Sequence, residues 1–230
     1  MKDAWDNKEF AKEWDEKSSK LNATRAEHLD IIVSILVDNY KSNSFILDIG
    51  SGSGQIEDLI LERNHSIKIV CVDSARPMIE MAQERLSRYK DNFQVVEKDI
   101  TKLELSDLPK GDYDYVFSCQ VTHELPSEEK IKLFKKVYEL LQPLGSFLVM
   151  DRIKVDYELF NESYRSILNR LGRLMNRPKS YEKFYQSFSD KEDFPASEEE
   201  YLSMLRLAGF KVATLHLHLD RAIMVGVKTI

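Results

Sequence analysis

Short apolar runs alternate with longer segments of helical period along most of the chain, and this alternation is what most constrains the fold. The runs are rich in Val, Ile and Phe, and they begin at Ser44, Ile67, Phe93, Tyr113 and Ser146. Helical candidates lie at 55–64, 77–90 and 127–142, and only the link after the third run lacks a convincing long helix. Strands that alternate with helices are typical of a parallel sheet with helices on both faces. We therefore expect a doubly wound α/β fold.

The end of the chain follows a different pattern. Apolar runs start at Leu215 and Ala222, and only the polar Asp220 and Arg221 separate the two. A connection this short requires antiparallel pairing. A helix with Ser197 as its N-cap is predicted just before them. The sequence therefore predicts five alternating units followed by a terminal hairpin.

Two segments fall outside this pattern, a leader of helical period and an insertion before the last helix. A chain of 230 residues is long enough to bury one sizeable core, so we expect one folded unit. The predicted division is a helical N-terminal cap at 1–43, a cofactor-binding core at 44–151, a helical insertion or substrate lid at 152–196, and a C-terminal helix and hairpin at 197–230 that complete the core.

Composition and charge narrow the class of partner. The net charge is -6 and no basic cluster dominates one face, which argues against an extended nucleic-acid footprint and favours a small molecule. The first residues have no apolar signal-peptide core, and the longest apolar stretches are too short to cross a bilayer. We expect a cytoplasmic protein with no membrane partner. Cys71 and Cys119 lack the spacing of a zinc or redox pair and are predicted to be reduced core thiols.

Gly50, Gly52 and Gly54 follow the first apolar run, where a strand leads into a helix. Glycines there let the backbone turn tightly and approach a ligand closely. The position after Gly54 is Gln55. A triphosphate-binding loop needs Lys at this position, and a dinucleotide-binding loop needs its third glycine there. Asp48 would repel a pyrophosphate but suits a ligand that carries an ammonium group. A ligand without phosphates is therefore favoured.

The next two strands also deliver an acidic residue to the same edge of the sheet. Asp73 ends the second run, where a carboxylate can accept hydrogen bonds from both ribose hydroxyls, and Asp99 ends the third. A single Asp at a strand end is usually a helix cap or a turn former. Three such residues, Asp48 included, beside a glycine loop indicate a ligand site where open α/β sheets bind ligands.

At this point the chain resembles the class I S-adenosylmethionine-dependent methyltransferases over nearly its whole length. The resemblance is carried by "ILDIGSGSG", "VCVDSARPMIEMA", "EKDIT", "YDYVFSCQVTHEL" and "LLQPLGSFLVMD". The last of these departs from the usual Lys-Pro-Gly-Gly turn and has Leu144 before Gly145, in a loop away from the ligand site. The resemblance implies a seven-stranded, mostly parallel sheet with an antiparallel last strand, and S-adenosylmethionine as the cofactor.

The resemblance also implies a cofactor-binding set. Its members are Asp48, Gly50, Ser51 and Gly52 for the methionine part, Asp73 and Ser74 for the ribose, Asp99, the Ile100 amide and Met78 for the adenine, and Cys119 near the sulfonium. Ordinary core packing is the alternative for Met78 and Cys119. In the leader, Trp14 or Phe10 is a candidate to close over the cofactor and Arg25 a candidate to pair with a carboxylate. Helix packing and surface charge are equally weighted alternatives for these residues.

His123 and Glu124 directly follow the fourth strand and are the candidate catalytic residues. Methyl transfer is an in-line displacement, and a general base assists when the acceptor must lose a proton. The alternative is that His123 caps a helix or shapes the cofactor site. His216 and His218 share one face of a strand, but no third metal ligand is recognisable. Solvated strand positions are the favoured interpretation of both histidines, and we predict no metal site.

The insertion is rich in aromatic and basic side chains, which suit a lid over a planar, apolar or anionic acceptor. Helix packing and a dimer contact are the alternatives. These residues are Tyr157, Phe160, Tyr164, Tyr181, Phe184, Tyr185 and Phe188, with Arg165, Arg170, Arg173 and Arg177.

The leading hypothesis is a methyltransferase that acts on a small-molecule acceptor, as a monomer or a homodimer. Modification of tRNA or another macromolecule, and a non-catalytic module that only binds the cofactor, are the alternatives. A nicotinamide oxidoreductase is a distant fourth. The sequence leaves open the acceptor and whether oxygen, nitrogen, carbon or sulfur is methylated.

Overall fold

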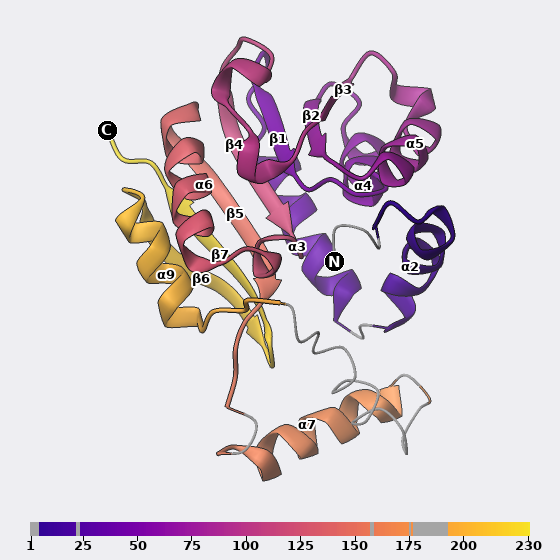
Figure 1. Cartoon of the computed structure of the whole chain (residues 1–230), viewed down its shortest axis with the longest axis vertical. Coiled ribbons are helices and arrows are strands. Elements are labelled where there is room, and N and C mark those ends of the chain that lie inside the picture. The colour runs from indigo at the N-terminus through magenta and orange to yellow at the C-terminus, as the bar shows by residue number, and fades with distance from the viewer. Residues whose placement is uncertain (1–4, 22–23, 157–158, 175, 177–192) are drawn as a thin grey trace.

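A computed structural model describes residues 5–21, 24–156, 159–174, 176 and 193–230, and it contains a seven-stranded sheet (Figure 1). The strands are β1 (Phe45–Ile49), β2 (Lys68–Asp73), β3 (Phe93–Glu97), β4 (Tyr113–Cys119), β5 (Leu141–Arg152), β6 (Lys211–His218) and β7 (Arg221–Val227). The helices are α2 (Lys8–Leu21), α3 (Arg25–Asp38), α4 (Gln55–Arg63), α5 (Arg76–Arg85), α6 (Ser127–Leu140), α7 (Asn161–Leu174) and α9 (Glu198–Leu207).

The strand order is β3-β2-β1-β4-β5-β7-β6. Strands β1 to β5 pair in parallel, and β7 runs antiparallel to both β5 and β6. The predicted doubly wound fold with an antiparallel last strand is thereby confirmed. The chain reverses its direction of winding between β1 and β4, and ligands bind at such a switch point in open α/β sheets. The glycine loop after β1 therefore lies at the expected place.

Helices cover both faces of the sheet. Side chains of α3 and α4, such as Ile32 and Ile60, pack with Ile46 of β1 in one core, while α6 and α9 pack with Leu47 in the other. Adjacent residues of β1 thus point into opposite cores, which explains why its sequence is a continuous apolar run. Cys71 is buried, Cys119 is partly buried, and neither forms a disulfide, as predicted.

The helix and strand boundaries differ from prediction at two places. Helix α6 ends at Leu140 and β5 begins at Leu141, so Pro143 and Gly145 lie inside the strand. They fit because the pairing of β4 with β5 is irregular between Tyr113 and Tyr115. Strand β6 begins at Lys211, four residues before the apolar run that predicted it. The link after β3 contains only short 3₁₀ turns, as expected.

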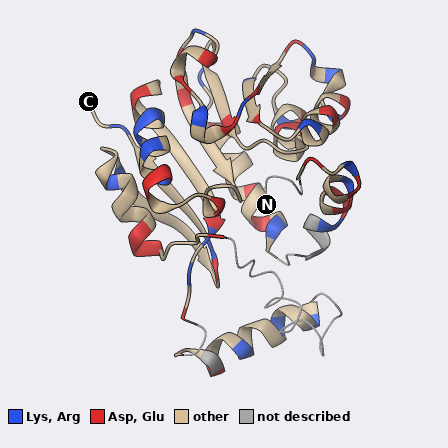
Figure 2. Ribbon diagram, viewed as in Figure 1, with Lys and Arg blue, Asp and Glu red and all other residues tan. Residues whose placement is uncertain are grey.

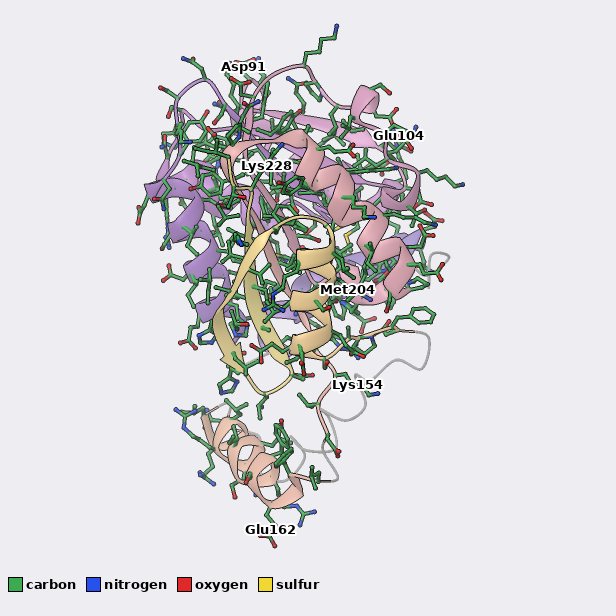
Figure 3. The ribbon with its side chains drawn as sticks, turned by 90° about the vertical axis from the view of Figure 1, so that its left-hand side faces the viewer. Asp91, Glu104, Lys154, Glu162, Met204 and Lys228 are labelled. Carbon is green, nitrogen blue, oxygen red and sulfur yellow. The ribbon has the colours of Figure 1, made fainter. Side chains whose placement is uncertain are left out.

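The insertion leaves the carboxyl end of β5 and carries α7 beyond the tip of the β6–β7 hairpin (Figure 3, where Lys154 and Glu162 mark the path). Arg165, Arg170 and Arg173 of α7 are exposed. Basic positions recur along this helix (Figure 2). Tyr157, Arg177 and the aromatic residues from Tyr181 to Phe188 lie outside the described residues. No helix in the described ranges is long and apolar enough to cross a membrane. The cytoplasmic location and the oligomeric state stay predictions, as does the division of the chain into segments.

Candidate functional site

The glycine loop holds the backbone in conformations that glycine favours, at the carboxyl end of β1. Gly50 and Gly52 have φ angles of +79° and +56°. A Cβ atom on Gly50 would overlap the side chain of Val121, whereas a Cβ on Gly52 would meet nothing within 4 Å. The amides of Gly50 and Ser51 both donate to the Val72 carbonyl oxygen, at 2.8 and 3.1 Å. The loop is thus tied to β2, and it presents an open side at Gly52.

Asp48 lies beneath this loop as one of two buried carboxyls. Its partner is Glu57 of α4, and the side chains are hydrogen-bonded to each other. Burial raises the pKa of Asp48 well above its usual value, and the adjacent Glu57 raises it further. Asp48 Oδ1 and Glu57 Oε2 are buried and have no hydrogen-bond partner among the described residues. A buried polar atom left this way costs about 1–3 kcal/mol, so the pair is suited to a hydrogen-bond donor from outside the chain.

Asp73 fastens the glycine loop to the start of α5. Its Oδ2 accepts a hydrogen bond from the Gly52 amide and its Oδ1 accepts one from the Ala75 amide, both at 2.8 Å. Burial raises the pKa of Asp73 despite these bonds. Ser74 is exposed beside it. Each carboxylate oxygen has a second lone pair, so Asp73 can still accept from hydroxyl groups.

Asp99 is a turn cap in this structure. Its Oδ1 accepts from the amide and the hydroxyl of Thr101, at 3.1 and 2.9 Å. Ile100 follows it, half-buried against the core. Met78 is 5% exposed and packs with Ala11 and Ala75 in a small cluster that Trp5 and Trp14 border. The leader thus covers the start of α5.

Helix α2 is held against the glycine loop by a polar contact between Asp15 and Arg85. Arg85 Nη2 donates to Asp15 Oδ2 at 2.7 Å, and Gln55 Nε2 donates to Asp15 Oδ1 at 2.6 Å. The Ser53 hydroxyl also bonds Asp15. Nearer the start of the chain, the Trp5 side chain hydrogen-bonds Glu124, whose pKa is raised by burial. Two parts of the leader therefore contact the loops that follow β1 and β4.

Arg25 points its guanidinium group at the same two loops. Nη1 donates to Gln120 Oε1 at 3.0 Å and Nη2 donates to Gln55 Oε1 at 3.1 Å. Both partners are neutral, and Arg25 makes no ion pair with a carboxylate in the described part of the chain. Burial lowers the pKa of Arg25. The charge of Asp15 acts on Arg25 without a direct ion pair. A partly buried cation with neutral hydrogen-bond partners suits a further anionic group.

His123 is clamped by Asp151 at the end of β5. Its Nδ1 lies 2.5 Å from Asp151 Oδ1, and its backbone amide donates to Asp151 Oδ2 at 2.9 Å. The Thr122 hydroxyl donates to the same Oδ2 at 2.5 Å. Burial alone would raise the pKa of Asp151, but the His123 ring and these hydrogen bonds lower it to about 2. An ionised Asp151 therefore fixes the ring and leaves Nε2 as the nitrogen that does not contact Asp151.

The returning end of the insertion packs against His123. The Phe194 amide donates to the His123 carbonyl oxygen at 2.7 Å, and Asp193 Oδ2 lies 3.7 Å from His123 Nε2. Asp193 also pairs with Arg152, at 2.6 Å. The buried Lys130, whose pKa burial lowers to about 8, donates to the Phe194 carbonyl oxygen at 2.6 Å. The insertion is thus anchored where a second substrate would approach the ring.

Comparison with known proteins gives this geometry its context. Residues 46–145 match a methyltransferase domain family. The ubiquinone/menaquinone biosynthesis C-methyltransferase UbiE of Rickettsia akari is 28% identical over 178 residues, which are 74% of this chain and 69% of that protein. The carboxy-S-adenosyl-L-methionine synthase of Nautilia profundicola is 21% identical over 89% of this chain and 86% of its own. The solved structure of PigF with SAH has a TM-score of 0.66 at 21% identity, and this chain spans 60% of it.

The matched domain, the relatives and the solved structures together support a class I S-adenosylmethionine-dependent methyltransferase. PigF, whose solved structure is with SAH, shares this fold. The residues of this chain fit the amino-acid part of S-adenosylmethionine, because Asp48 offers a buried acceptor and Arg25 offers a cation whose hydrogen-bond partners are neutral. Among the described residues, no three side chains gather as metal ligands.

Four residues of the methyltransferase site escape the sequence analysis. Asp151 could have been found, because it ends the fifth strand as Asp48 and Asp73 end theirs. Glu57 also has a signal, since it shares a helix face with Ile60 and Leu61 and is acidic within an apolar stripe. Asp15 and Arg85 have none, because their contact joins segments 70 residues apart.

Proposed function

We propose that this methyltransferase transfers the methyl group of S-adenosylmethionine to a small-molecule acceptor that is held beside His123. The observation that carries the proposal is the set of unmatched polar groups around the glycine loop. Asp48 provides an unsatisfied buried acceptor, Arg25 provides a cation, and both face a backbone that is open at Gly52. A zwitterionic amino acid carries the two complementary charges.

The proposed cofactor contacts follow from these positions. Asp48, with Gly50, Ser51 and Gly52, holds the ammonium end of the methionine part, and Arg25 holds its carboxylate. Asp73, with Ser74 beside it, accepts from the ribose hydroxyls. The adenine end is assigned to Asp99, the Ile100 amide and the cluster of Met78 and Trp14, and Cys119 borders the sulfonium from the end of β4.

The proposed chemistry needs little from the protein beyond position and one proton acceptor. When bound, S-adenosylmethionine supplies an electrophilic methyl group on its sulfonium. His123 Nε2 accepts the proton of a hydroxyl, phenol or acidic carbon, and Asp151 stabilises the resulting imidazolium at Nδ1. Glu124 is the second candidate for a base. Trp5 and the anchored end of the insertion exclude water from this edge.

The relatives support a small acceptor but do not choose the atom. Their names include a C-methyltransferase of quinone biosynthesis and, in Plasmodium falciparum, a phosphoethanolamine N-methyltransferase. The acceptor of this chain is to be found by incubating a metabolite extract with labelled S-adenosylmethionine and identifying the labelled product.

Calorimetry on the purified protein tests the cofactor site directly. S-adenosylmethionine and its demethylated product should bind, and NAD should not. Asp73→Ala should weaken that binding about a hundredfold, because it removes charge-assisted hydrogen bonds to the ribose. Asp91→Ala, an exposed carboxylate beside the amino end of β3, is the matched control and should bind normally (Figure 3). Equal affinities in the two variants would show that the ribose lies elsewhere.

A further inference from the structure

Four basic side chains gather where α3 meets the β6–β7 hairpin, and each holds buried nitrogen atoms without a partner. Arg25 and His28 come from α3, His216 from β6 and Arg221 from β7. Among the described residues, nothing hydrogen-bonds Arg25 Nε, either ring nitrogen of His28, His216 Nε2 or Arg221 Nε. Buried polar atoms are almost always satisfied in a working protein. Such a gathering of nitrogen atoms therefore indicates a ligand.

An irregularity in β6 creates this arrangement. The pairing of β6 with β7 shifts between Thr214 and His216, so Leu215 is an extra residue in the ladder. After the shift His216 pairs with Ile223, whose side chain belongs to the core that α3 covers. The His216 ring consequently meets the fully buried His28 ring edge-on, with 5.0 Å between the ring centroids. Without the extra residue, the alternation of the strand would direct His216 to the other face.

The charges around His28 all have the same sign. Burial lowers the pKa of His28 to about 4, and the nearby groups that lower it further are His216, His218, Arg221 and Arg25. No acidic group is among them. Beyond this first layer, Glu27 and Arg170 act on His218. The region is therefore electropositive and enclosed, which favours an anion.

The acidic residues near Arg221 already form ion pairs. Arg221 Nη1 pairs with Asp220 Oδ2 at 2.8 Å, which leaves Nε directed elsewhere. Arg221 also lies directly opposite Arg152 in the β5–β7 ladder, and Arg152 pairs with Asp193. Two cations thus lie opposite each other across the strands, and each is paired with one aspartate.

We propose that the buried nitrogen atoms between α3 and the β6–β7 hairpin bind an anionic group, a carboxylate or a phosphate, that belongs to the methyl acceptor. This inference rests on the proposed function, since it assigns a charge to the acceptor. The position of these side chains favours the methyl acceptor over the cofactor as the molecule that carries the anionic group. Arg25 directs its Nη atoms to the loops after β1 and β4, while His28 and His216 lie toward β7. There Arg221 lies opposite Arg152 in the ladder, and Arg152 pairs with Asp193, whose Oδ2 is 3.7 Å from His123 Nε2.

The test uses the histidine proton resonances of the full chain. The chain has five histidines, so each signal can be assigned from single variants. Inorganic phosphate and acetate are added separately, with chloride at equal ionic strength as the reference, in the absence and presence of S-adenosylmethionine. A bound anion should move the titration midpoint of His28 upward by at least one pH unit, which corresponds to a tenfold or greater coupling. A response to only one of the two anions identifies the group.

Variants then separate binding from general charge effects. Arg221→Lys keeps the charge but removes Nε, and His216→Gln removes the ring, so each should weaken anion binding at least tenfold. His65→Gln, whose ring stacks on Tyr89 far from the hairpin, is the control and should respond like the parent. Calorimetry with S-adenosylmethionine reports whether each variant is folded.

The possible outcomes distinguish the two proposals. If S-adenosylmethionine binds but neither anion moves His28, the anion site is wrong and the proposed function stands. An anion response that survives in both Arg221→Lys and His216→Gln also overturns the site. If S-adenosylmethionine does not bind the parent protein, the proposed function fails, whatever the anions do.

Discussion

At the scale of single residues, Asp151 is the group on which the His123 ring depends. It is fully buried, ionised over the working range, and bonded to Nδ1 of the ring. Asp151→Asn should lower kcat/KM about a hundredfold once the acceptor is known, because the carboxylate no longer stabilises the protonated ring. The acid limb of the rate profile should move to lower pH for the same reason. Affinity for S-adenosylmethionine should not change.

Thr122→Val serves as the matched control for this prediction. It removes a hydrogen bond to Asp151 Oδ2 and leaves the contact with Nδ1 in place. We expect a much smaller loss of rate and no movement of the acid limb. If both variants lose the same rate with the same profile, Asp151 supports the local fold only.

Leu144 is a residue whose backbone conformation conflicts with its side chain. Its φ angle is +65° and its side chain is 60% exposed, so it gains little burial for the strain. Leu144→Gly should raise the free energy of unfolding by about 1 kcal/mol, because the left-handed region costs a branched residue roughly this amount. Urea unfolding of both proteins measures the difference.

Gly145→Ala tests the same segment with a change that should lower the free energy of unfolding. An added Cβ would lie 2.8 Å from the Gln142 carbonyl oxygen, so this variant should be less stable than the parent. A Leu144→Gly protein that is also destabilised would mean that the Leu144 side chain contributes packing that outweighs the strain.

At the scale of elements, α2 is the part of the leader that bears on cofactor exchange. Its Asp15 bonds Arg85, Gln55 and Ser53, so the helix is tied to the loop that we propose holds the methionine part. Asp15→Asn should speed release of the demethylated cofactor about tenfold, as expected when a partly buried ion pair worth roughly 1.4 kcal/mol is lost. Stopped-flow displacement measures this rate.

Glu13→Gln is the control on the same helix. Glu13 also pairs with a cation, Lys17, but both side chains are exposed and neither contacts the loop. Its removal should leave the release rate unchanged, since exposed pairs contribute little. Equal release rates in Asp15→Asn and Glu13→Gln would show that α2 does not control exchange.

The elements also show what sequence patterns can predict. Strands β1 and β2 are readable because both of their faces are buried, which leaves nearly unbroken apolar runs. The start of β5 is not readable, since Leu141 to Gly145 contain a proline and belong to an irregular region of the ladder. Glu57, Asp15 and Arg85 act through contacts between distant segments, which no local period encodes. A search for acidic residues at the carboxyl ends of strands finds Asp48, Asp73 and Asp99. The same search finds Asp151 when it includes the fifth strand.

At the scale of the whole molecule, ligand charge and stability are linked through the histidines under the hairpin. The net charge of the protein is -6, yet the region between α3 and β7 is electropositive. Two sets of unsatisfied atoms thus lie along one edge of the sheet, acceptors at the glycine loop and nitrogens near the hairpin. An edge built in this way favours a zwitterion at one end and an anion at the other.

The same region should make the protein without ligand sensitive to acid. His28 has a pKa of about 4 in the folded chain and about 6.5 when unfolded, so the unfolded state binds the proton first as the pH falls. Stability from this residue is complete above pH 6.5 and is lost progressively down to pH 4. Between pH 7.5 and 5 the loss should be about 2 kcal/mol, from urea unfolding in chloride buffer. The free energy of unfolding of His28→Leu should fall by about 2 kcal/mol less than that of the parent over that interval. Asp48 and Glu57 have raised pKa values, which favour the folded state as the pH falls, but they act equally in both proteins. Identical pH dependence in the two proteins would mean that the His28 ring is already protonated or solvated when folded.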